Sequence, residues 1–240
     1  MNYLYNLPKS FKPKYNFDLI RLGRNNDGGY LVGENTIKNT ENLISIGIYD
    51  DWSFEKDFRK RKKILNLLMI DNQLDIFFLI KSFFIKKYVK LKLIAIRNII
   101  DYFLFVKNNF QHFYVSKKNF KTILQPYKKN IFLKIDIEGS EYNLLNEIVH
   151  FKNRICGIAI EFHSADVNIK KIENFIKDLG FYITNIHINN YSTFGKNLIP
   201  KVIEITLEKN PRIVKYSYIN ENNLNHRNNV YKKDLKICYK

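Results

Sequence analysis

Short runs of apolar residues, each followed by acidic or turn-forming residues, recur along the chain. Runs of this length that end at turn signals predict buried β-strands. The last two runs are close in sequence, and the final one alternates apolar and polar residues, so we expect them to pair as an antiparallel hairpin. The predicted strands span residues 42–49, 65–70, 131–135, 155–162, 181–189 and 202–208.

Helical patterns separate several of these runs. Ser53 can cap a helix that follows the first run. A second helix is expected over residues 140–151. A third is expected over residues 168–179, where apolar residues repeat at the helical period and Gly180 supplies the stop. Strands that alternate with helices predict an open α/β sheet with mostly parallel strands.

A turn signal near the amino end has two readings. Residues 25–29 (NNDGG) favour a tight turn, and residues 30–32 form a short strand after it. The segment is either a plain hairpin tip or part of a binding site, because paired glycines let backbone N–H groups approach a ligand. Residues 1–17 form an extended lead-in whose prolines oppose a helix.

Residues 74–110 interrupt the alternation of strands and helices. They are rich in phenylalanine, isoleucine and lysine, with a lysine every few positions. This pattern predicts one or two amphipathic helices that pack on the domain or form a homodimer contact. Alternatively, they form a basic amphipathic surface that contacts an anionic membrane from one side. A third sheet strand is expected within this segment or in residues 112–120, and residues 211–240 form a polar basic tail.

The composition limits the classes of partner. The chain has 240 residues and a net charge of +17, which suggests nucleic acid, anionic lipid or an anionic substrate. The lysines are spread along the chain, so we expect no nucleic-acid partner. Two cysteines cannot form a disulfide framework or a cysteine zinc site, and no signal peptide or membrane span is evident. We therefore expect a cytoplasmic protein.

Most of the predicted strands end in side chains that can carry chemistry, and the carboxyl ends of parallel strands meet at one edge of a sheet. The central example is the stretch IFLKIDIEGSEYNLLNE at residues 131–147. Carboxylates and imidazoles there could bind Mg²⁺ or Mn²⁺, or could serve as a general base for a hydroxyl. The residues at these strand ends are Asp50, Asp51, Asp71, Asp136, Glu138, Glu161, His163, His187, Asn189 and Asn190.

Two segments resemble the FkbM-type family of S-adenosylmethionine-dependent methyltransferases. ISIGIYDDWSFEKDF is similar to the family's S-x-G-x-x-x-D-x-S-F-E segment, and LKIDIEGSEYNLL contains its K-I-D-x-E-G segment. RLGRNNDGGYLV, IEFH and HINN are similar to the branch associated with bacterial surface carbohydrates. The resemblance covers about residues 18–208 without the 74–110 insertion. It implies a Rossmann-like class I methyltransferase fold, with a seven-stranded, mostly parallel sheet, an antiparallel C-terminal hairpin and flanking helices, in one domain over residues 1–240.

The same resemblance implies roles for individual residues. Cofactor binding falls on Asp27, Gly28, Gly29, Tyr30, Gly47, Asp50, Glu55, Asp71 and Asp136. Catalysis falls on His163, Asp136, Glu138 and His187. Acceptor binding falls on Glu161, His163, Asn189 and Asn190. A metal ion, if one is used, falls on Asp136, Glu138, Glu161 and His163.

The expected activity is O-methylation of a sugar, a nucleotide-linked sugar or a sugar-linked group for a capsular or other surface polysaccharide. Methyl transfer from a sulfonium requires mainly alignment of the acceptor oxygen, the methyl carbon and the sulfur, together with removal of the hydroxyl proton. The surplus of lysine and arginine suits a phosphate-bearing acceptor. Two alternatives are a methyltransferase acting on RNA or lipid, and a basic binding protein without turnover.

Overall fold

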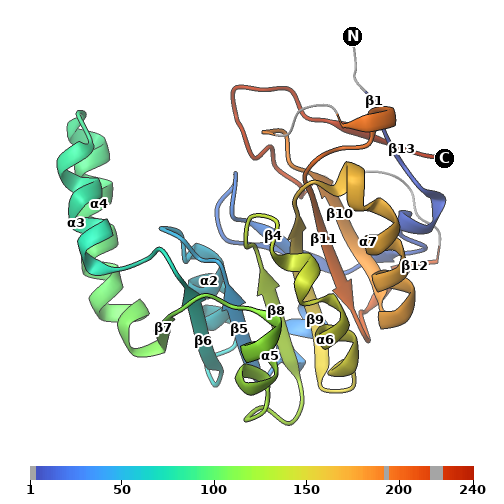
Figure 1. The fold of residues 1–240 in the computed structure, drawn as a ribbon, viewed down its shortest axis with the longest axis horizontal. Coiled ribbons are helices and arrows are strands. Elements are labelled where there is room, and N and C mark those ends of the chain that lie inside the picture. The colour runs from blue at the N-terminus through green and yellow to red at the C-terminus, as the bar shows by residue number, and fades with distance from the viewer. Residues whose placement is uncertain (1–3, 192–194, 217–223) are drawn as a thin grey trace.

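A seven-stranded sheet forms the centre of the computed structural model, which describes residues 4–191, 195–216 and 224–240 (Figure 1). Its strands lie in the spatial order β10-β11-β9-β8-β5-β6-β7. Among the seven, β11 alone is reversed, between β9 and β10. The α/β class and the antiparallel C-terminal hairpin predicted from the sequence are confirmed. The strands are β5 (Asn42–Ile46), β6 (Asn66–Asp71), β7 (Phe110–His112), β8 (Ile131–Ile135), β9 (Ile155–Phe162), β10 (Tyr182–Ile188) and β11 (Ile203–Glu208).

The helices cover both faces of this sheet, which explains why the strands are apolar runs rather than alternating ones. Alternate residues of one strand enter different cores: Leu133 packs in the larger cluster, whereas its neighbour Phe132 packs with Phe54 and Phe58 of α2. One face is covered by α5 (Lys117–Leu124), α6 (Leu145–His150) and α7 (Ala165–Leu179). The other is covered by α1 (Glu34–Asn39), α2 (Ser53–Arg61) and a hairpin of β3 (Leu19–Leu22) and β4 (Tyr30–Gly33).

Two helix starts differ from the sequence prediction. The helix expected over residues 140–151 begins as a single 3-10 turn, Glu141–Asn143, before α6. The Glu141 carboxylate accepts the backbone N–H groups of Gly139 and His163, which fixes this turn separately from the helix that follows. Ser53 does not cap α2 but is its first residue, and its N–H donates to Asp51 Oδ1 at 3.0 Å.

The segment between β6 and β7 forms a helical hairpin, which we define as residues 76–106. It contains α3 (Ile76–Ile85), α4 (Val89–Asp101) and a π-helical turn, Tyr102–Val106. A 3-10 turn, Lys107–Asn109, follows the hairpin and connects it to β7. Figure 1 shows the hairpin standing beside the sheet instead of lying on it, and among the described side chains of α3 and α4 only Leu79 and Ala95 are buried. None of the helices in the described residues has the length and apolar content needed to cross a membrane.

The chain ends pack against each other and against the body. The strand β1 (Leu4–Leu7) pairs in parallel with β13 (Lys236–Tyr239). The strand β2 (Asn16–Phe17) pairs with β12 (Ile213–Lys215). One 3-10 turn, Lys9–Phe11, follows β1, and another, Lys196–Leu198, lies between β10 and β11. The polar tail expected from residue 211 onward is therefore attached to the domain in its described parts. Residues 224–235 return across the carboxyl edge of the sheet, where they contact His187 and Glu204.

Candidate active site

A cavity of about 640 Å³ opens at the carboxyl edge of the sheet. It lies where β5, β6 and β8 end, and the turn between β3 and β4 closes one side of it. Eight of the residues singled out from the sequence line it: Asp27, Gly28, Gly47, Asp50, Asp51, Asp71, Asp136 and Glu138. The volume is in the range of pockets that hold small-molecule ligands and cofactors.

Gly47 is required by the way two strand ends cross at this cavity. Its φ of +79° lies in the left-handed region, and a Cβ built on it would sit 1.6 Å from the carbonyl oxygen of Asp136. The buried Lys134 of β8 donates from its ammonium to the Gly47 carbonyl at 2.6 Å, which holds the loop after β5 against the end of β8. The backbone after β5 is thus exposed to the cavity without a side chain in front of it.

Asp71, at the end of β6, holds two cavity loops together. One of its oxygens accepts the N–H groups of Gln73 at 2.6 Å and Leu74 at 3.0 Å, and the other accepts the N–H of Tyr49 at 2.9 Å. Three of the roughly four acceptor positions of a carboxylate are therefore used. Asp71 remains part of the cavity wall, with room for one further donor such as a hydroxyl.

The turn between β3 and β4 is tied to the loop after β5 by charge. Arg24 Nε lies 3.0 Å from Asp51 Oδ2, and a Cβ on Gly28 would meet the same carboxylate oxygen at 2.7 Å. Gly28 also has a φ of +84°. The glycine allows the turn to approach Asp51 closely, so that the turn becomes a wall of the cavity.

An acid–histidine cluster adjoins the cavity through Asp136. His163 Nε2 lies 3.2 Å from a Glu138 oxygen and 3.6 Å from a Glu161 oxygen. Ligand atoms of Asp136, Glu161 and His163 all lie within 4.8 Å of one another. The structure therefore brings together these four residues, which come from the ends of β8 and β9, as the sequence predicts.

The cluster changes the protonation of its members. Burial raises the pKa of Asp136 to about 6, against the opposing charges of Lys134 and His163. Burial, together with the charges of Asp136 and Glu204, raises the pKa of Glu161 well above its ordinary value. Burial disfavours the imidazolium of His163, but the neighbouring carboxylates outweigh this effect and raise its pKa. At neutral pH, Asp136 is thus mostly ionised and close to its titration range.

Glu141, which the sequence reasoning did not single out, orients His163. It is fully buried, its Oε1 accepts the backbone N–H of His163 at 2.6 Å, and the same oxygen lies 3.4 Å from His163 Nδ1. Tyr142 donates its hydroxyl to the carbonyl of His163 at 2.7 Å. An acidic residue directly after the IDIEGS turn was the available signal, but its inward direction depends on the 3-10 turn at Glu141–Asn143.

A chain of polar contacts continues from this cluster across β9 and β11 to the edge strand β10. Glu161, Glu204 and His187 are cross-strand neighbours on β9, β11 and β10. His187 Nδ1 lies 3.3 Å from Glu204, and its Nε2 lies 3.5 Å from Asp234 of the C-terminal segment. These carboxylates raise the pKa of His187 to about 9, although burial opposes the charge.

Amide side chains complete this chain of contacts. Asn228 donates to both Glu204 and Asp27, and its distance to Asp27 Oδ1 is 3.0 Å. Asn189 donates to Glu161 at 3.0 Å and to Asp27 at 3.3 Å. The C-terminal segment is therefore part of the wall around the acidic cluster, because Asn228 and Asp234 both belong to it.

Other residues singled out from the sequence lie away from the cavity lining. Glu55 is fully buried against β5, where Ser45 Oγ donates to it. Asn190 donates to the backbone of the C-terminal segment, including Asn229 at 2.9 Å. Gly29 lies against the backbone of Arg24 inside the turn. Tyr30 is buried with its ring against Phe54, and its hydroxyl donates to Asp136 Oδ2 at 3.4 Å.

The acid–histidine cluster suits a divalent cation by ligand type but not by the state of its imidazole. Carboxylates with one imidazole are a donor set for Mn²⁺ or Mg²⁺. However, both ring nitrogens of His163 face carboxylates, and its pKa is raised, whereas a ligating imidazole must be neutral. The residues present therefore do not fit a bound metal ion.

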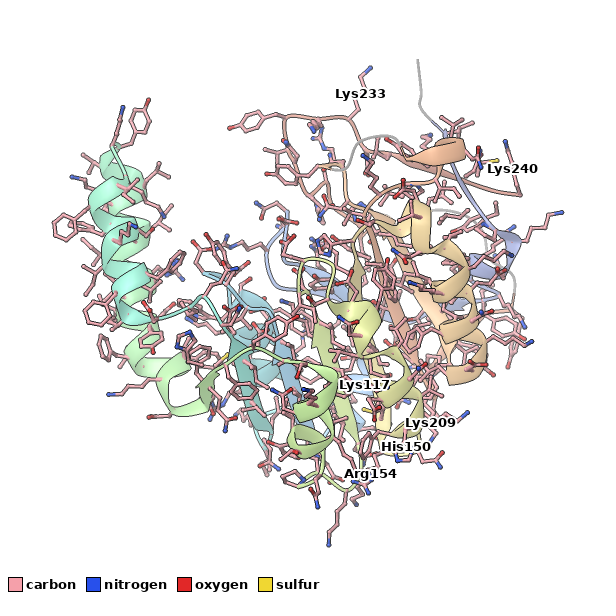
Figure 2. The ribbon with its side chains drawn as sticks, in the orientation of Figure 1. Lys117, His150, Arg154, Lys209, Lys233 and Lys240 are labelled. Atoms are coloured by element: carbon pink, nitrogen blue, oxygen red, sulfur yellow. The ribbon has the colours of Figure 1, made fainter. Side chains whose placement is uncertain are left out.

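A second cavity, of about 280 Å³, lies at the opposite edge of the sheet, among residues that include Cys156, Arg154 and Lys209. Figure 2 shows Arg154 and Lys209 at that lower edge, close to His150. Burial raises the pKa of the Cys156 thiol to about 11, which keeps it from acting as a nucleophile near neutral pH. None of the residues singled out for chemistry lines this cavity, so the carboxyl edge is the candidate active site.

Comparison with known proteins gives the same family as the sequence resemblance but over different bounds, because the match includes most of residues 74–110 and leaves out the segment ISIGIYDDWSFEKDF. Residues 79–183 match the family model of the Methyltransferase FkbM domain, a stretch that contains β8, β9 and the acid–histidine cluster. A comparison with curated proteins finds no match.

Solved structures that are similar include the precorrin-6y C5,15-methyltransferase of Geobacter metallireducens GS-15, with 14% identity and a TM-score of 0.40 over 73% of this chain and 86% of that chain. Another is the Methanococcus jannaschii fibrillarin pre-rRNA processing protein, with 10% identity and a TM-score of 0.39 over 82% of this chain and 84% of that chain.

Proposed function

We propose that this chain, whose residues 79–183 carry an FkbM-type methyltransferase domain, transfers a methyl group from S-adenosylmethionine to a hydroxyl of a sugar or sugar-linked group. The observation that carries the proposal is the position of Asp136. It lines the cavity of about 640 Å³ and also belongs to the acid–histidine cluster. A cofactor in the cavity and an acceptor at the cluster would therefore meet at this side chain.

The cavity lining supports a cofactor of this kind. When bound, S-adenosylmethionine supplies an activated methyl carbon on a sulfonium. Gly28 and Gly47 allow close approach of backbone, and Asp50 and Asp71 offer carboxylates to hydroxyl or ammonium groups. The apolar side chains of Ile46, Ile48, Ile70 and Val115 offer a surface for a flat base.

Asp136 is the group best suited to take the acceptor's proton. A general base works best when its pKa lies near the operating pH, and that of Asp136 is raised to about 6. His163, whose pKa the neighbouring carboxylates raise, holds its proton more firmly than a free imidazole. It can donate a hydrogen bond to the acceptor oxygen while it balances the charge of Glu138. His163 is then a positioning and charge-balancing group rather than the base.

The polar groups of the cluster favour a neutral, hydroxyl-rich acceptor. Glu161, Glu204 and Asp27 are hydrogen-bond acceptors for sugar hydroxyls, and Asn189 can donate as well as accept. The Asp136 carboxylate beside them, which is mostly ionised at neutral pH, repels a phosphate placed next to it. A nucleotide-linked sugar therefore fits only with its phosphates outside the cluster, and a monosaccharide unit of a surface polysaccharide fits directly.

Calorimetry with S-adenosylmethionine and S-adenosylhomocysteine tests the first half of the proposal. We expect both to bind at micromolar concentrations, and the absence of binding by either would contradict it. Methyl transfer to a panel of nucleotide sugars and oligosaccharides, followed by mass spectrometry, tests the second half. Transfer to RNA or lipid but to none of the sugars would contradict the proposed acceptor class, while the proposed methyl transfer from S-adenosylmethionine would stand.

A further inference from the structure

The helical hairpin, residues 76–106, carries an unusual share of the exposed apolar surface. Of the 26 large hydrophobic side chains that are exposed in the described residues, 13 belong to it. They lie on both helices and at the turn between them, where Phe84, Ile85, Tyr88 and Val89 are each exposed by 65–74%. Figure 2 shows side chains standing out along the length of both helices. A soluble monomer rarely exposes a contiguous apolar patch of this kind without a partner.

The charge of the same segment has one sign. From Ile76 to Lys107 the sequence has seven basic residues and one acidic residue, Asp101. The Asp101 carboxylate is already paired, since it lies 2.7 Å from the ammonium of Lys56. Lys86 and Lys87 occupy the turn directly beside the exposed Phe84 and Ile85. The turn therefore combines exposed apolar side chains with two lysines that form no ion pair with any described residue.

The base of the hairpin is fixed to the rim of the active-site cavity. Phe78 of α3 contacts the ring of Tyr49, a cavity residue, with ring centroids 5.1 Å apart. Asn98 of α4 donates to the carbonyl of Asp50 at 3.2 Å. In Figure 1 the free end of the hairpin, with the turn, points to the same side as the carboxyl edge of the sheet. A surface bound at the turn would thus lie on the side of the cavity opening.

We propose that the helical hairpin is a docking element for an anionic lipid bilayer. Apolar and aromatic side chains interleaved with lysine are what an interfacial helix presents to acidic headgroups. A second copy of this chain would bring two sets of seven basic residues together, which like-charge repulsion opposes. Nucleic acid would neutralise the lysines but would leave the exposed Phe84 and Ile85 in water. The inference does not depend on the chemistry proposed for the cavity.

Vesicle flotation tests this assignment with the full chain. Vesicles of phosphatidylcholine alone are compared with vesicles that also contain phosphatidylglycerol, at low and at high salt. We expect binding to the phosphatidylglycerol vesicles and its loss at high salt. Absence of binding, or equal binding to both kinds of vesicle, would overturn the proposal.

Matched variants locate the contact. Lys86→Gln with Lys87→Gln should lower the partition coefficient by about five-fold per lysine. The control Lys117→Gln with Lys118→Gln removes the same charge from α5 and should change nothing. Phe84→Ser with Ile85→Ser should weaken the binding seen at low salt, whereas Ile64→Ser, at a 90% exposed residue of the body, should not.

Two further results would overturn the proposal. Equal losses for the α5 control and the hairpin variant would reduce the effect to general charge and overturn the proposal. A dimer in light scattering that disappears in Phe84→Ser with Ile85→Ser would give the surface to a second copy of the chain. Circular dichroism and binding of S-adenosylmethionine, measured on each variant, separate loss of docking from loss of fold or of cofactor binding.

Discussion

The carboxyl edge of the sheet and the helical hairpin are opposites in the same chain. At the edge, Glu161 and Glu204 are buried, and amide and imidazole groups hold them in a fixed network. On the hairpin, lysines and large apolar side chains are exposed, and Asp101 is the one acidic residue. The net charge of +17 therefore describes the outer surface and not the candidate active site. Partner chemistry has to be inferred region by region.

Removal of the Asp136 charge should produce the largest loss of methyl transfer and should leave vesicle binding by the hairpin unchanged. Asp136→Asn cannot take a proton, so we expect methyl transfer to fall by about 10²–10⁴-fold. In the native enzyme, kcat/KM should rise with pH as Asp136 loses its proton near pH 6, and should fall again when His163 loses its proton. The rise near pH 6 should be absent in Asp136→Asn.

The hairpin supplies the control for that experiment. Lys86→Gln with Lys87→Gln should keep native methyl transfer to a soluble acceptor, and Asp136→Asn should bind vesicles as the native chain does. Native activity in Asp136→Asn would show that the base lies elsewhere and would remove Asp136 from the mechanism.

The backbone of the site should tolerate far less change than the hairpin. Gly47→Ala places a methyl group against the carbonyl of Asp136 at a positive φ, so we expect a loss of about 2–4 kcal/mol in the free energy of unfolding. Gly139→Ala also has a positive φ but no atom within 4 Å of the added Cβ. It should cost about 1 kcal/mol. Val89→Ala in the hairpin should stay within about 0.5 kcal/mol of native.

Urea unfolding followed by circular dichroism measures these differences. Equal losses for the two glycine variants would mean that the crossing of β5 and β8 relaxes freely. The close approach between Gly47 and Asp136 would then not be what requires a glycine at this position.

The C-terminal segment should contribute a smaller, pH-dependent stabilisation to the site. The pKa of His187 is raised from 6.5 to about 9 by Asp234 and Glu204. Because the folded-state value is the higher one, this stabilisation is fully present below pH 6.5 and is lost as the pH rises through about 9. Asp234 is about half exposed, so water screens its share. Asp234→Asn should cost about 1 kcal/mol near pH 6 and almost nothing near pH 10.

Thermal unfolding at both pH values measures the stabilisation that Asp234 contributes. Asp178→Asn on α7 is the control for the loss of an exposed carboxylate. A cost of Asp234→Asn that does not change with pH would mean that Asp234 acts through packing and not through the charge of His187.

Much of the fold could be predicted because apolar runs determine buried strands. The run at residues 131–135 reads the same in sequence and in structure, since a central strand buries both faces. The C-terminal hairpin was equally predictable from two adjacent runs. The hairpin at residues 76–106 was predicted as helical, but its projection from the body was not. Lysines every few positions leave no single apolar face that would show how the helices pack against the sheet.

The site was predictable only where a side chain follows a strand directly. Asp136, Glu138, Glu161 and His163 meet because β8 and β9 are neighbours in the sheet. Asn228 could not be predicted: it contacts Asp27, 201 residues away, from a segment without hydrophobic period. Glu55 sits at the expected place in the helix, yet the helix phase turns it toward Ser45 instead of the cavity.

Chelation should have the smallest effect and therefore tests how the acidic cluster balances its charge. If His163 is the internal cation for Asp136 and Glu138, the cluster needs no metal, and enzyme treated with EDTA and then dialysed should keep full methyl transfer. In that case His163→Gln should fail to regain activity when Mg²⁺ or Mn²⁺ is added. Loss of activity on chelation, with recovery in Mn²⁺, would contradict this account. His163 would then be a neutral ligand, and Asp136 and Glu161 its partners at the ion, since the ligand atoms of these three residues lie within 4.8 Å of one another.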